Sequence, residues 1–299
     1  MNSKAFCYSA LVLFAALSAG RDVFAKELFQ NKSVDPIFFT WVGSSVTWII
    51  FYFTVSVRFS KPYLFEDISA LSTRLKARLL LLNVATLIAF GTAMLAVKEL
   101  NAYFAAVLDY GASPLVIAGL AAWLRGVRVT KLGMLGMGFS FLGIVGLSHR
   151  MIDATKTSEL GIIYAVVSCF SMAFAQILTK DLISARITRD KLMVARLPLL
   201  VVGMGAWSFA GGHYHVGVDW MQLVLTGVFG WSLPLFLIVL AVEQLQVKDV
   251  SLAFFLVPVF TFVGTMARGH FGSGTIIWPY AVAGIIVLAG VVIAERNSS

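Results

Sequence analysis

The sequence predicts an all-α integral membrane protein whose ten transmembrane helices form two inverted repeats of five helices each. The first observation is composition: of 299 residues, 59% are hydrophobic and only 13% are charged, whereas soluble domains are about a quarter charged. The mean hydropathy is +0.89. The second observation is that the apolar residues gather in runs of about 20, the length that a helix needs to cross a bilayer. The third is an internal similarity between the two halves of the chain.

The internal similarity is clearest in two stretches about half the chain apart. Residues 95–116 read LAVKELNAYFAAVLDYGASPLV, and residues 240–260 read LAVEQLQVKDVSLAFFLVPVF. Each begins Leu-Ala-Val-x-x-Leu, crosses a short polar break and enters an apolar run that contains one proline. We therefore expect a first repeat over residues 1–150 and a second over residues 151–299. Because five is an odd number of spans, the second repeat enters the membrane with opposite polarity, an arrangement found in many secondary transporters.

Ten apolar runs of suitable length are separated by breaks too short to hold a folded soluble domain. The runs do not alternate apolar and polar residues, as strands of a membrane barrel do, so we predict helices. The first run resembles a signal peptide but continues apolar to residue 29, and we interpret it as the first membrane helix. The predicted spans are residues 6–27, 36–57, 78–97, 102–123, 131–149, 159–180, 191–211, 221–243, 249–268 and 276–294.

The net charge is +8, and the Lys and Arg residues cluster in the short breaks between apolar runs. This distribution is typical of a membrane protein and argues against a nucleic-acid-binding protein. With the N-terminus inside, fifteen of these Lys and Arg residues fall on the inner side and six on the outer side, in agreement with the positive-inside rule. We therefore expect both termini in the cytoplasm and a plasma-membrane location, specifically a bacterial inner membrane. The two cysteines, Cys7 and Cys169, lie inside apolar runs and are interpreted as packing residues.

Several motifs resemble a known family of membrane proteins. The fourth and ninth predicted spans carry SPLV at residues 113–116 and VPVF at residues 257–260. The fifth span carries GMGFSFLGIV at residues 136–145, with a similar pattern at residues 283–291, and Arg196 lies in the seventh span, where many members carry an arginine. These features resemble the EamA type of the drug/metabolite transporter superfamily. The resemblance implies a secondary transporter that exports an amino acid or a related organic ion by alternating access.

Four charged residues lie deep in predicted spans: Arg21, Asp22, Asp109 and Arg196. Each costs at least about 2.5 kcal/mol to insert, and intramembrane ions are therefore functional-site candidates. In one interpretation, Arg21 and Arg196 face a central cavity and bind an anionic group, while Asp22 or Asp109 binds an ammonium group or carries a coupling proton. In the other, Arg21 pairs with Asp109, Asp22 pairs with Lys26, and Arg196 caps a helix end near the inner surface.

Polar aromatic and amide side chains extend the list of candidate substrate-binding residues. We add Trp41, Tyr110, Gln176 and Trp231, which lie in predicted spans and suit an amphipathic ligand. Gln176 lies in the sixth span at the position that corresponds to Asp22 in the first. It equally suits a hydrogen bond to a neighbouring helix.

Two prolines occupy corresponding positions in the two halves, Pro114 in the fourth span and Pro258 in the ninth. A proline inside a helix frees a backbone carbonyl and kinks the helix. We predict that these residues act as hinges. Kinks that only serve packing explain them equally well.

The sequence favours a carrier over an enzyme. It contains no Gly-rich phosphate loop, no metal-ligand spacing and no ordering of Ser, His and Asp that suits nucleophilic catalysis. We therefore expect no enzymatic activity, no metal and no cofactor, with proton coupling as an option. The expected partners are the lipid bilayer and a small-molecule substrate, and the expected state is a monomer or homodimer. The competing classes are a membrane-embedded lipid-modifying enzyme and a channel or scaffold protein.

Overall fold

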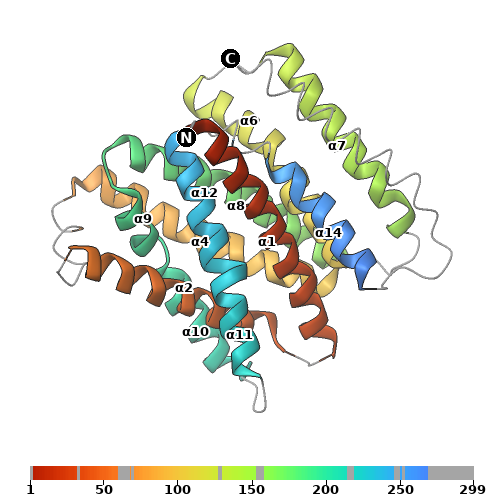
Figure 1. Cartoon of the computed structure of the whole chain (residues 1–299), viewed down its shortest axis with the longest axis horizontal. Helices are drawn as coiled ribbons and strands as arrows, with labels where there is room; N and C mark the ends of the chain where they lie inside the picture. The colour runs from red at the N-terminus through yellow and green to blue at the C-terminus, as the bar shows by residue number, and fades with distance from the viewer. Residues whose placement is uncertain are drawn as a thin grey trace.

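The computed structural model describes residues 3–31, 34–59, 68, 71–126, 130–152, 158–213, 219–245, 250 and 253–268. Every secondary-structure element within these ranges is helical, as the sequence predicts, and long helices dominate the molecule (Figure 1). Seven helical segments of the described chain are long and apolar enough to cross a membrane: Phe6–Gln30, Pro36–Arg58, Thr73–Glu99, Ala102–Leu124, Glu159–Ser184, Arg189–Ala210 and Trp220–Gln244.

Nine of the ten predicted runs fall on helices, and the tenth, residues 276–294, lies outside the described residues. Five of the nine are uninterrupted helices: α1 (Ser3–Asn31), α2 (Pro36–Phe59), α4 (Thr73–Glu99), α7 (Lys131–Ile152) and α8 (Glu159–Ser184). The other four are interrupted: α5 (Ala102–Ala106), η1 (Val107–Gly111) and α6 (Ser113–Arg125); α9 (Arg189–Ala195) and α10 (Pro198–Ala210); α11 (Trp220–Thr226), η2 (Gly227–Ser232) and α12 (Leu233–Gln244); η3 (Ala253–Phe255) and α14 (Leu256–Ala267).

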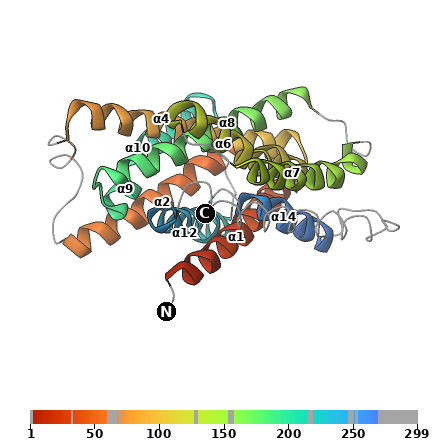
Figure 2. The ribbon, with the colours of Figure 1, turned by 90° about the horizontal axis from the view of Figure 1, so that it is seen from above.

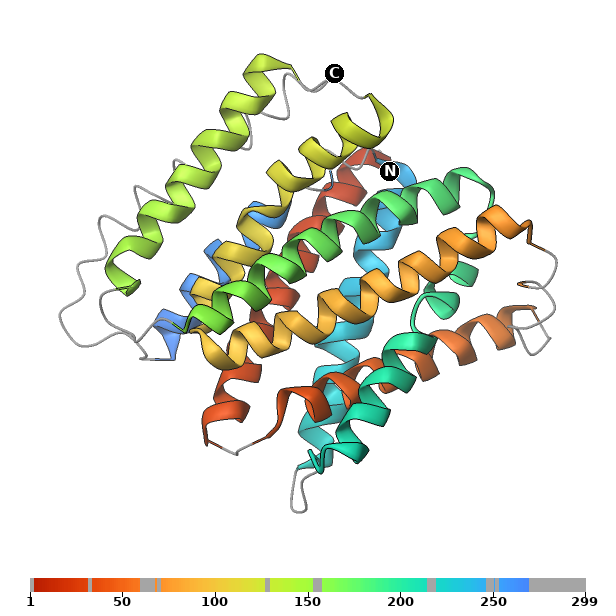
Figure 3. The same ribbon diagram turned by 180° about the vertical axis from the view of Figure 1, so that it is seen from behind.

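The long helices pack in two layers around a common centre. On one face α4 lies beside α8 along most of its length (Figure 3). On the other face α1 packs against α12 and α14, and the view from above separates these helices from α4 and α8 (Figure 2). The hydrophobic core between the layers contains side chains from both halves of the chain.

The interruptions in the helices follow from local sequence. Pro114, Pro198 and Pro234 each lie in the first turn of a new helical segment. A proline lacks a backbone N–H and its ring clashes with the carbonyl of the fourth preceding residue, so the helix before it cannot continue unchanged. Pro258 lies near the start of α14, directly after the 3-10 turn η3. Both predicted hinge residues, Pro114 and Pro258, therefore lie at interruptions, and their role as hinges stays a prediction.

Two of the interruptions are π-helical, and serine hydroxyls satisfy backbone groups in both. In η1 the hydroxyl of Ser113 donates to the carbonyl oxygen of Asp109 at 2.7 Å. In η2 the hydroxyl of Ser232 donates to the carbonyl oxygen of Gly227 at 2.9 Å. A bilayer contains no water to satisfy freed backbone groups, so such side-chain bonds are needed where a helix is irregular. Short π segments occur frequently at functional sites, and these two flank the centre of the bundle.

Candidate functional site

A cavity lies at the centre of the bundle, where α1, α4, η1, α8, η2, α12, η3 and the junction between α9 and α10 meet. About 20 Å³ of it is open to the centre of a water molecule, which is room for roughly one water. A larger ligand therefore requires the cavity to widen. The side chains that line it are Phe14, Ser18, Arg21, Phe90, Tyr110, Met172, Gln176, Arg196, Trp231, Pro234, Leu235, Ile238 and Phe254.

Five of the eight predicted substrate-binding residues line this one cavity: Arg21, Tyr110, Gln176, Arg196 and Trp231. They come from five separate elements, and each is at most 5% exposed. Polar side chains in an apolar bundle turn toward each other or toward a cavity because lipid cannot satisfy them. The structure thus brings together residues that are far apart in the sequence.

Arg21 is held by bonds to its neighbour in the chain and to η1. Its Nε and Nη2 donate to Oδ1 of Asp22 at 2.8 and 2.7 Å, and Nη2 also donates to the Tyr110 hydroxyl at 2.8 Å. The guanidinium lies over the Trp231 ring, 5.2 Å from its centroid, a favourable arrangement for a cation and an aromatic face. The charge of Arg21 is therefore compensated within the protein.

These bonds correct two predicted ion pairs. Arg21 was predicted to pair with Asp109 in one interpretation, but its hydrogen bonds go to Asp22 and Tyr110. Asp22 was predicted to pair with Lys26, but the Lys26 ammonium donates to the carbonyl oxygen of Lys98 at the end of α4, 2.7 Å away. The spacing of four residues puts two side chains on one helix face, but it does not take account of a long arginine side chain folding back onto the adjacent carboxylate.

Asp109 lies beside the cavity and does not line it. It is 4% exposed and belongs to η1, which packs against α8. Its Oδ1 has no hydrogen-bond partner among the described residues. Oγ of Ser113, which donates to the Asp109 backbone carbonyl, lies 3.6 Å from Sγ of Cys169. Cys7 and Cys169 are both buried free thiols, which agrees with their interpretation as packing residues.

Arg196 is presented to the cavity by a break between two helices. Helix α9 ends at Ala195, and α10 begins at Pro198. Asn83 of α4 bridges the break: its Nδ2 donates to the Ala195 carbonyl at 2.7 Å, and its Oδ1 accepts from the Leu199 N–H at 3.3 Å. Sequence reasoning missed Asn83, although an amide inside an otherwise apolar run was a visible signal.

The Arg196 guanidinium is buried with few partners. The residue is 0% exposed, and among the described residues its side chain donates one hydrogen bond, from Nη2 to the Thr86 hydroxyl at 3.4 Å. Its Nε and Nη1 have no hydrogen-bond partner among the described residues. The sequence allowed Arg196 to be a helix cap near the inner surface. It does cap α9, but it lies fully buried against the cavity.

Gln176 and Trp231 also present unpaired polar atoms. Gln176 Nε2 lies 3.8 Å from the sulfur of Met172, while Gln176 Oε1 and Trp231 Nε1 have no partner in the described part of the chain. The Trp231 indole stacks on Phe90 with ring centroids 4.9 Å apart. Its approach to α2 depends on Gly43, because a Cβ at that position would lie 2.7 Å from Trp231 Nε1.

Trp41 lies away from these residues. Its half-buried ring packs edge-on against Phe209, with centroids 5.0 Å apart, and against Phe38 at 5.9 Å. It is not among the side chains that line the cavity. The sequence shows that an aromatic residue lies in a span but not which face of α2 it occupies.

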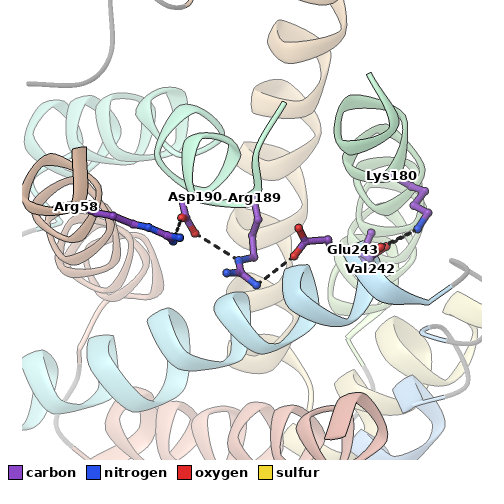
Figure 4. A network of polar contacts seen from close by, with 6 residues as sticks. All are labelled: Arg58, Lys180, Arg189, Asp190, Val242 and Glu243. Atoms are coloured by element: carbon purple, nitrogen blue, oxygen red, sulfur yellow. Dashed lines mark hydrogen bonds and ion pairs between the residues drawn. The ribbon is translucent and has the colours of Figure 1, made fainter. Parts of the chain in front are cut away.

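One end of the bundle is closed by charged side chains from four helices (Figure 4). Arg58 of α2 pairs with Asp190 of α9. Arg189 bonds Glu243 at the end of α12, with Nη1 and Oε2 3.1 Å apart. Lys180 of α8 donates to the Val242 carbonyl at 2.7 Å. We call this set, Arg58, Lys180, Arg189, Asp190 and Glu243, the network end.

Charged side chains also tie helices together at the opposite end of the bundle. Arg268, which follows α14, pairs with Glu27 of α1, and Lys26 of α1 bonds the end of α4. Arg58, Lys180 and Arg189 of the network end are among the fifteen residues on the predicted inner side. Lys26 and Arg268 of the opposite end are among the six on the predicted outer side. The two groups therefore lie at the two ends of the helices, with the cavity between them.

Comparison with known proteins gives a family match over the first half of the chain and a shared fold. Residues 5–149 match the EamA-like transporter family. Chains of solved structures also match, among them one whose title reads only "Crystal structure of protein": it is 14% identical, with a TM-score of 0.74 over 99% of this chain and 97% of that chain. At this identity the likeness establishes the fold alone. No curated protein matches the chain.

Proposed function

We propose that this chain, whose residues 5–149 match the EamA-like transporter family, is a secondary transporter of the EamA type of the drug/metabolite transporter superfamily, with the central cavity as its substrate site. It moves a small polar or amphipathic metabolite, an amino acid or a related organic ion, in the direction of export. Transport proceeds by alternating access in a bacterial inner membrane, with both termini in the cytoplasm. The family supports the transporter class, and the remaining features are the proposal.

The single observation that carries this proposal is the convergence of polar side chains on one cavity. Arg21, Tyr110, Gln176, Arg196 and Trp231 come from five elements in both halves of the chain and line the same space. A bundle that only needs to be stable gains little from buried ionic groups, since apolar side chains of similar volume often serve as well or better. A binding site, in contrast, requires polar groups at the middle of the membrane.

Helix packing supports the proposal of ten helices in two inverted repeats. If the second repeat begins near residue 151, α8 corresponds to α1, while α12 and α14 correspond to α4 and to the segment that ends in α6. The first helix, α1, packs against α12 and α14, and its counterpart α8 packs against α4 and α6. Each repeat thus packs its first helix against the third and fourth helices of the other repeat, as a two-fold relation requires.

The closures at the two ends support alternating access. Ion pairs join helices at the network end and at the opposite end, and the cavity between them has room for roughly one water. A carrier needs to open one closure at a time to reach the site from either side. The proposed hinges are Pro114 and Pro258, which lie in the first turns of α6 and α14.

Proton coupling is a further part of the proposal, with Asp109 as the better candidate carrier than Asp22. The Asp22 carboxylate bonds Arg21 twice. Asp109, by comparison, is buried and has an oxygen without a hydrogen-bond partner in the described residues. We expect Asp109→Asn to abolish the response of transport to an imposed pH gradient and to leave exchange of substrate for substrate intact. A transport rate of the unmodified protein that does not depend on pH would contradict proton coupling.

The test of transport is substrate counterflow in proteoliposomes that contain the purified full chain. Vesicles preloaded with amino acids, organic acids or polyamines are given the same compound in radiolabelled form. Saturable accumulation for at least one class, and its loss in Ser18→Leu, which fills the cavity, support the proposal. Gly20→Ala is the control on the same helix, since a Cβ there would meet nothing within 4 Å. Flux that never saturates would indicate a channel, and no flux with a folded protein would favour a scaffold or a lipid-modifying enzyme.

A further inference from the structure

The charge balance of the cavity distinguishes its two arginines. Arg21 and Arg196 are the charged residues among the described side chains that line it. The Arg21 charge is compensated by Asp22, whose Oδ1 accepts two hydrogen bonds from it. No described carboxylate forms an ion pair with Arg196. The cavity therefore carries one net positive charge, and that charge belongs to Arg196.

The burial of the Arg196 charge indicates what kind of ligand the cavity binds. Arg196 is 0% exposed, and two of its three guanidinium nitrogens lack a partner within the described part of the chain. A guanidinium keeps its charge in proteins, and a buried charge without a counter-ion is strongly unfavourable. A bound anion would supply both the opposite charge and the missing hydrogen-bond acceptors. A planar guanidinium suits a carboxylate in particular, because it presents parallel N–H donors to two oxygens.

The walls of the cavity indicate the rest of the ligand. The rings of Phe14, Phe90, Phe254 and Trp231 line it together with the Tyr110 ring, and aromatic side chains contact an apolar or aromatic body well. Among the described lining residues no carboxylate is present to receive an ammonium group: the unpaired acceptor there is the neutral Gln176 Oε1. Of the nearby carboxylates, Asp22 is occupied by Arg21, and Asp109 lies outside the lining.

We propose that Arg196 binds the carboxylate of an amphipathic organic acid that has an aromatic or alkyl body and lacks an amine. This proposal rests on the proposed function, since it assigns the ligand of the same cavity, and it narrows that function from amino acids and related ions to organic anions. Arg21 then shapes the site together with Asp22 and Tyr110, and Arg196 is the residue that contacts the ligand's charge. The break between α9 and α10, which Asn83 bridges, positions Arg196 for this contact.

The binding test compares four probes of similar shape on the purified full chain: phenylacetate, phenylacetamide, phenethylamine and phenylalanine. A ligand that binds the folded protein raises its thermal midpoint in a concentration-dependent way. We expect phenylacetate to raise the midpoint and the neutral amide and the amine to leave it unchanged. A shift with phenethylamine, or a larger shift with phenylalanine than with phenylacetate, would overturn the assignment. So would the absence of any shift with phenylacetate up to tens of millimolar.

Variants locate the site of binding. Arg196→Met is expected to abolish the phenylacetate shift. Arg196→Lys is expected to lower the affinity for phenylacetate at least tenfold, because lysine keeps the charge but loses the planar donors. Arg74→Met is the control, since this arginine is exposed at the start of α4 and belongs to neither closure. A phenylacetate shift that persists in Arg196→Met would contradict the proposal.

The stability of the ligand-free variants gives a second and independent test. If Arg196 is an uncompensated charge awaiting a ligand, Arg196→Met removes an unfavourable group and leaves the ligand-free thermal midpoint unchanged or raises it. If Arg196 is instead a structural ion-pair partner, the midpoint falls by several degrees and the proposal fails. Arg21→Met serves for comparison and is expected to lower the midpoint, because it leaves Asp22 buried without its partner.

The outcomes separate this inference from the proposed function. Saturable counterflow that does not depend on Arg196 would retain the transporter and overturn the anion site. Phenylacetate binding that is lost in Arg196→Met, in a protein that shows no counterflow with any compound, would retain the anion site and overturn transport.

Discussion

At the scale of single residues, the Arg21–Asp22–Tyr110 cluster illustrates how an intramembrane charge becomes tolerable. Two donors of one guanidinium share one carboxylate oxygen, and a phenol hydroxyl accepts a third bond. Both charged side chains are only 3% exposed, so solvent screens their attraction little. Arg21 and Tyr110 of the cluster line the cavity. Because Asp22 already compensates the charge of Arg21, the cluster does not need a further ion.

The first prediction concerns this pair. Asp22→Asn keeps the shape of the side chain but removes the charge that compensates Arg21. Breaking a buried ion pair from one side is expected to lower the free energy of unfolding by about 3–5 kcal/mol, measured by chemical unfolding in detergent. The double variant Arg21→Met with Asp22→Leu removes both charges and is expected to recover most of this loss. Equal loss in the single and double variants would contradict this account, because the loss would then not come from leaving one buried charge unpaired.

The sequence predicted the members of the site better than their pairing. Five residues were identified because polar groups are costly inside apolar spans and are therefore often functional. All five line the cavity: Arg21, Arg196, Tyr110, Gln176 and Trp231. Which arginine is compensated depends on the neighbours of each side chain in three dimensions, and helix periodicity alone does not contain that information. The apolar lining was not predicted either, because its residues are ordinary members of apolar runs.

At the scale of elements, the interrupted helices determine what reaches the cavity. The break between α9 and α10 presents Arg196, η1 presents Tyr110, and η2 presents Trp231. Pro114 predicted the interruption beside η1, whereas the interruptions beside Pro198 and Pro234 and the π-helical segments themselves were not predicted. Their extra residue depends on how the helix packs against its neighbours and not on a local sequence signal.

The bridge from α4 to the α9–α10 break gives the second prediction. Asn83→Ala removes the donor to the Ala195 carbonyl and the acceptor of the Leu199 N–H. Leaving these buried groups unpaired is expected to lower the free energy of unfolding by about 1–3 kcal/mol and to weaken ligand binding at Arg196. Thr92→Ala is the control on the same helix, since its hydroxyl is exposed and bonds the Ile88 carbonyl of α4 itself. Equal effects of both variants would exclude a special role for the bridge.

Close contact between α2 and η2 gives the third prediction. A Cβ at residue 43 would lie 2.7 Å from Nε1 of Trp231, so Gly43→Ala displaces the indole from the cavity wall. We expect a loss of about 1–3 kcal/mol in unfolding free energy, as for other overpacked sites, together with reduced transport. Gly20→Ala has open space around it and is expected to be neutral or stabilising by up to about 1 kcal/mol. Unfolding and counterflow of the two variants check this.

At the scale of the whole molecule, composition and run length were sufficient to predict an all-helical membrane protein, and the EamA-type resemblance was confirmed. Nine predicted spans lie on helices, while the tenth falls outside the described residues. The arrangement of helices around the cavity could not be predicted, because it depends on contacts such as α1 with α12 that join distant parts of the chain. The orientation in the membrane and the inverted repeat stay predictions.

We propose that the cavity opens alternately to the two sides of the membrane through the closures at its two ends. Glu243→Gln weakens the Arg189 bond at the network end, and Glu27→Gln weakens the Arg268 bond at the opposite end. These two variants are therefore expected to shift the protein in opposite directions. Each weakens one closure and leaves the cavity lining unchanged.

The most direct measurement labels a cysteine in the cavity from each side of the membrane. Ser18→Cys, in a chain with Cys7→Ala and Cys169→Ala, is exposed to an impermeant maleimide in right-side-out and inside-out vesicles. We predict labelling from both sides, with Glu243→Gln raising the rate from the network end and lowering it from the other, and Glu27→Gln doing the reverse. Labelling from one side only, or rates that rise on both sides together, would contradict alternating access through this cavity.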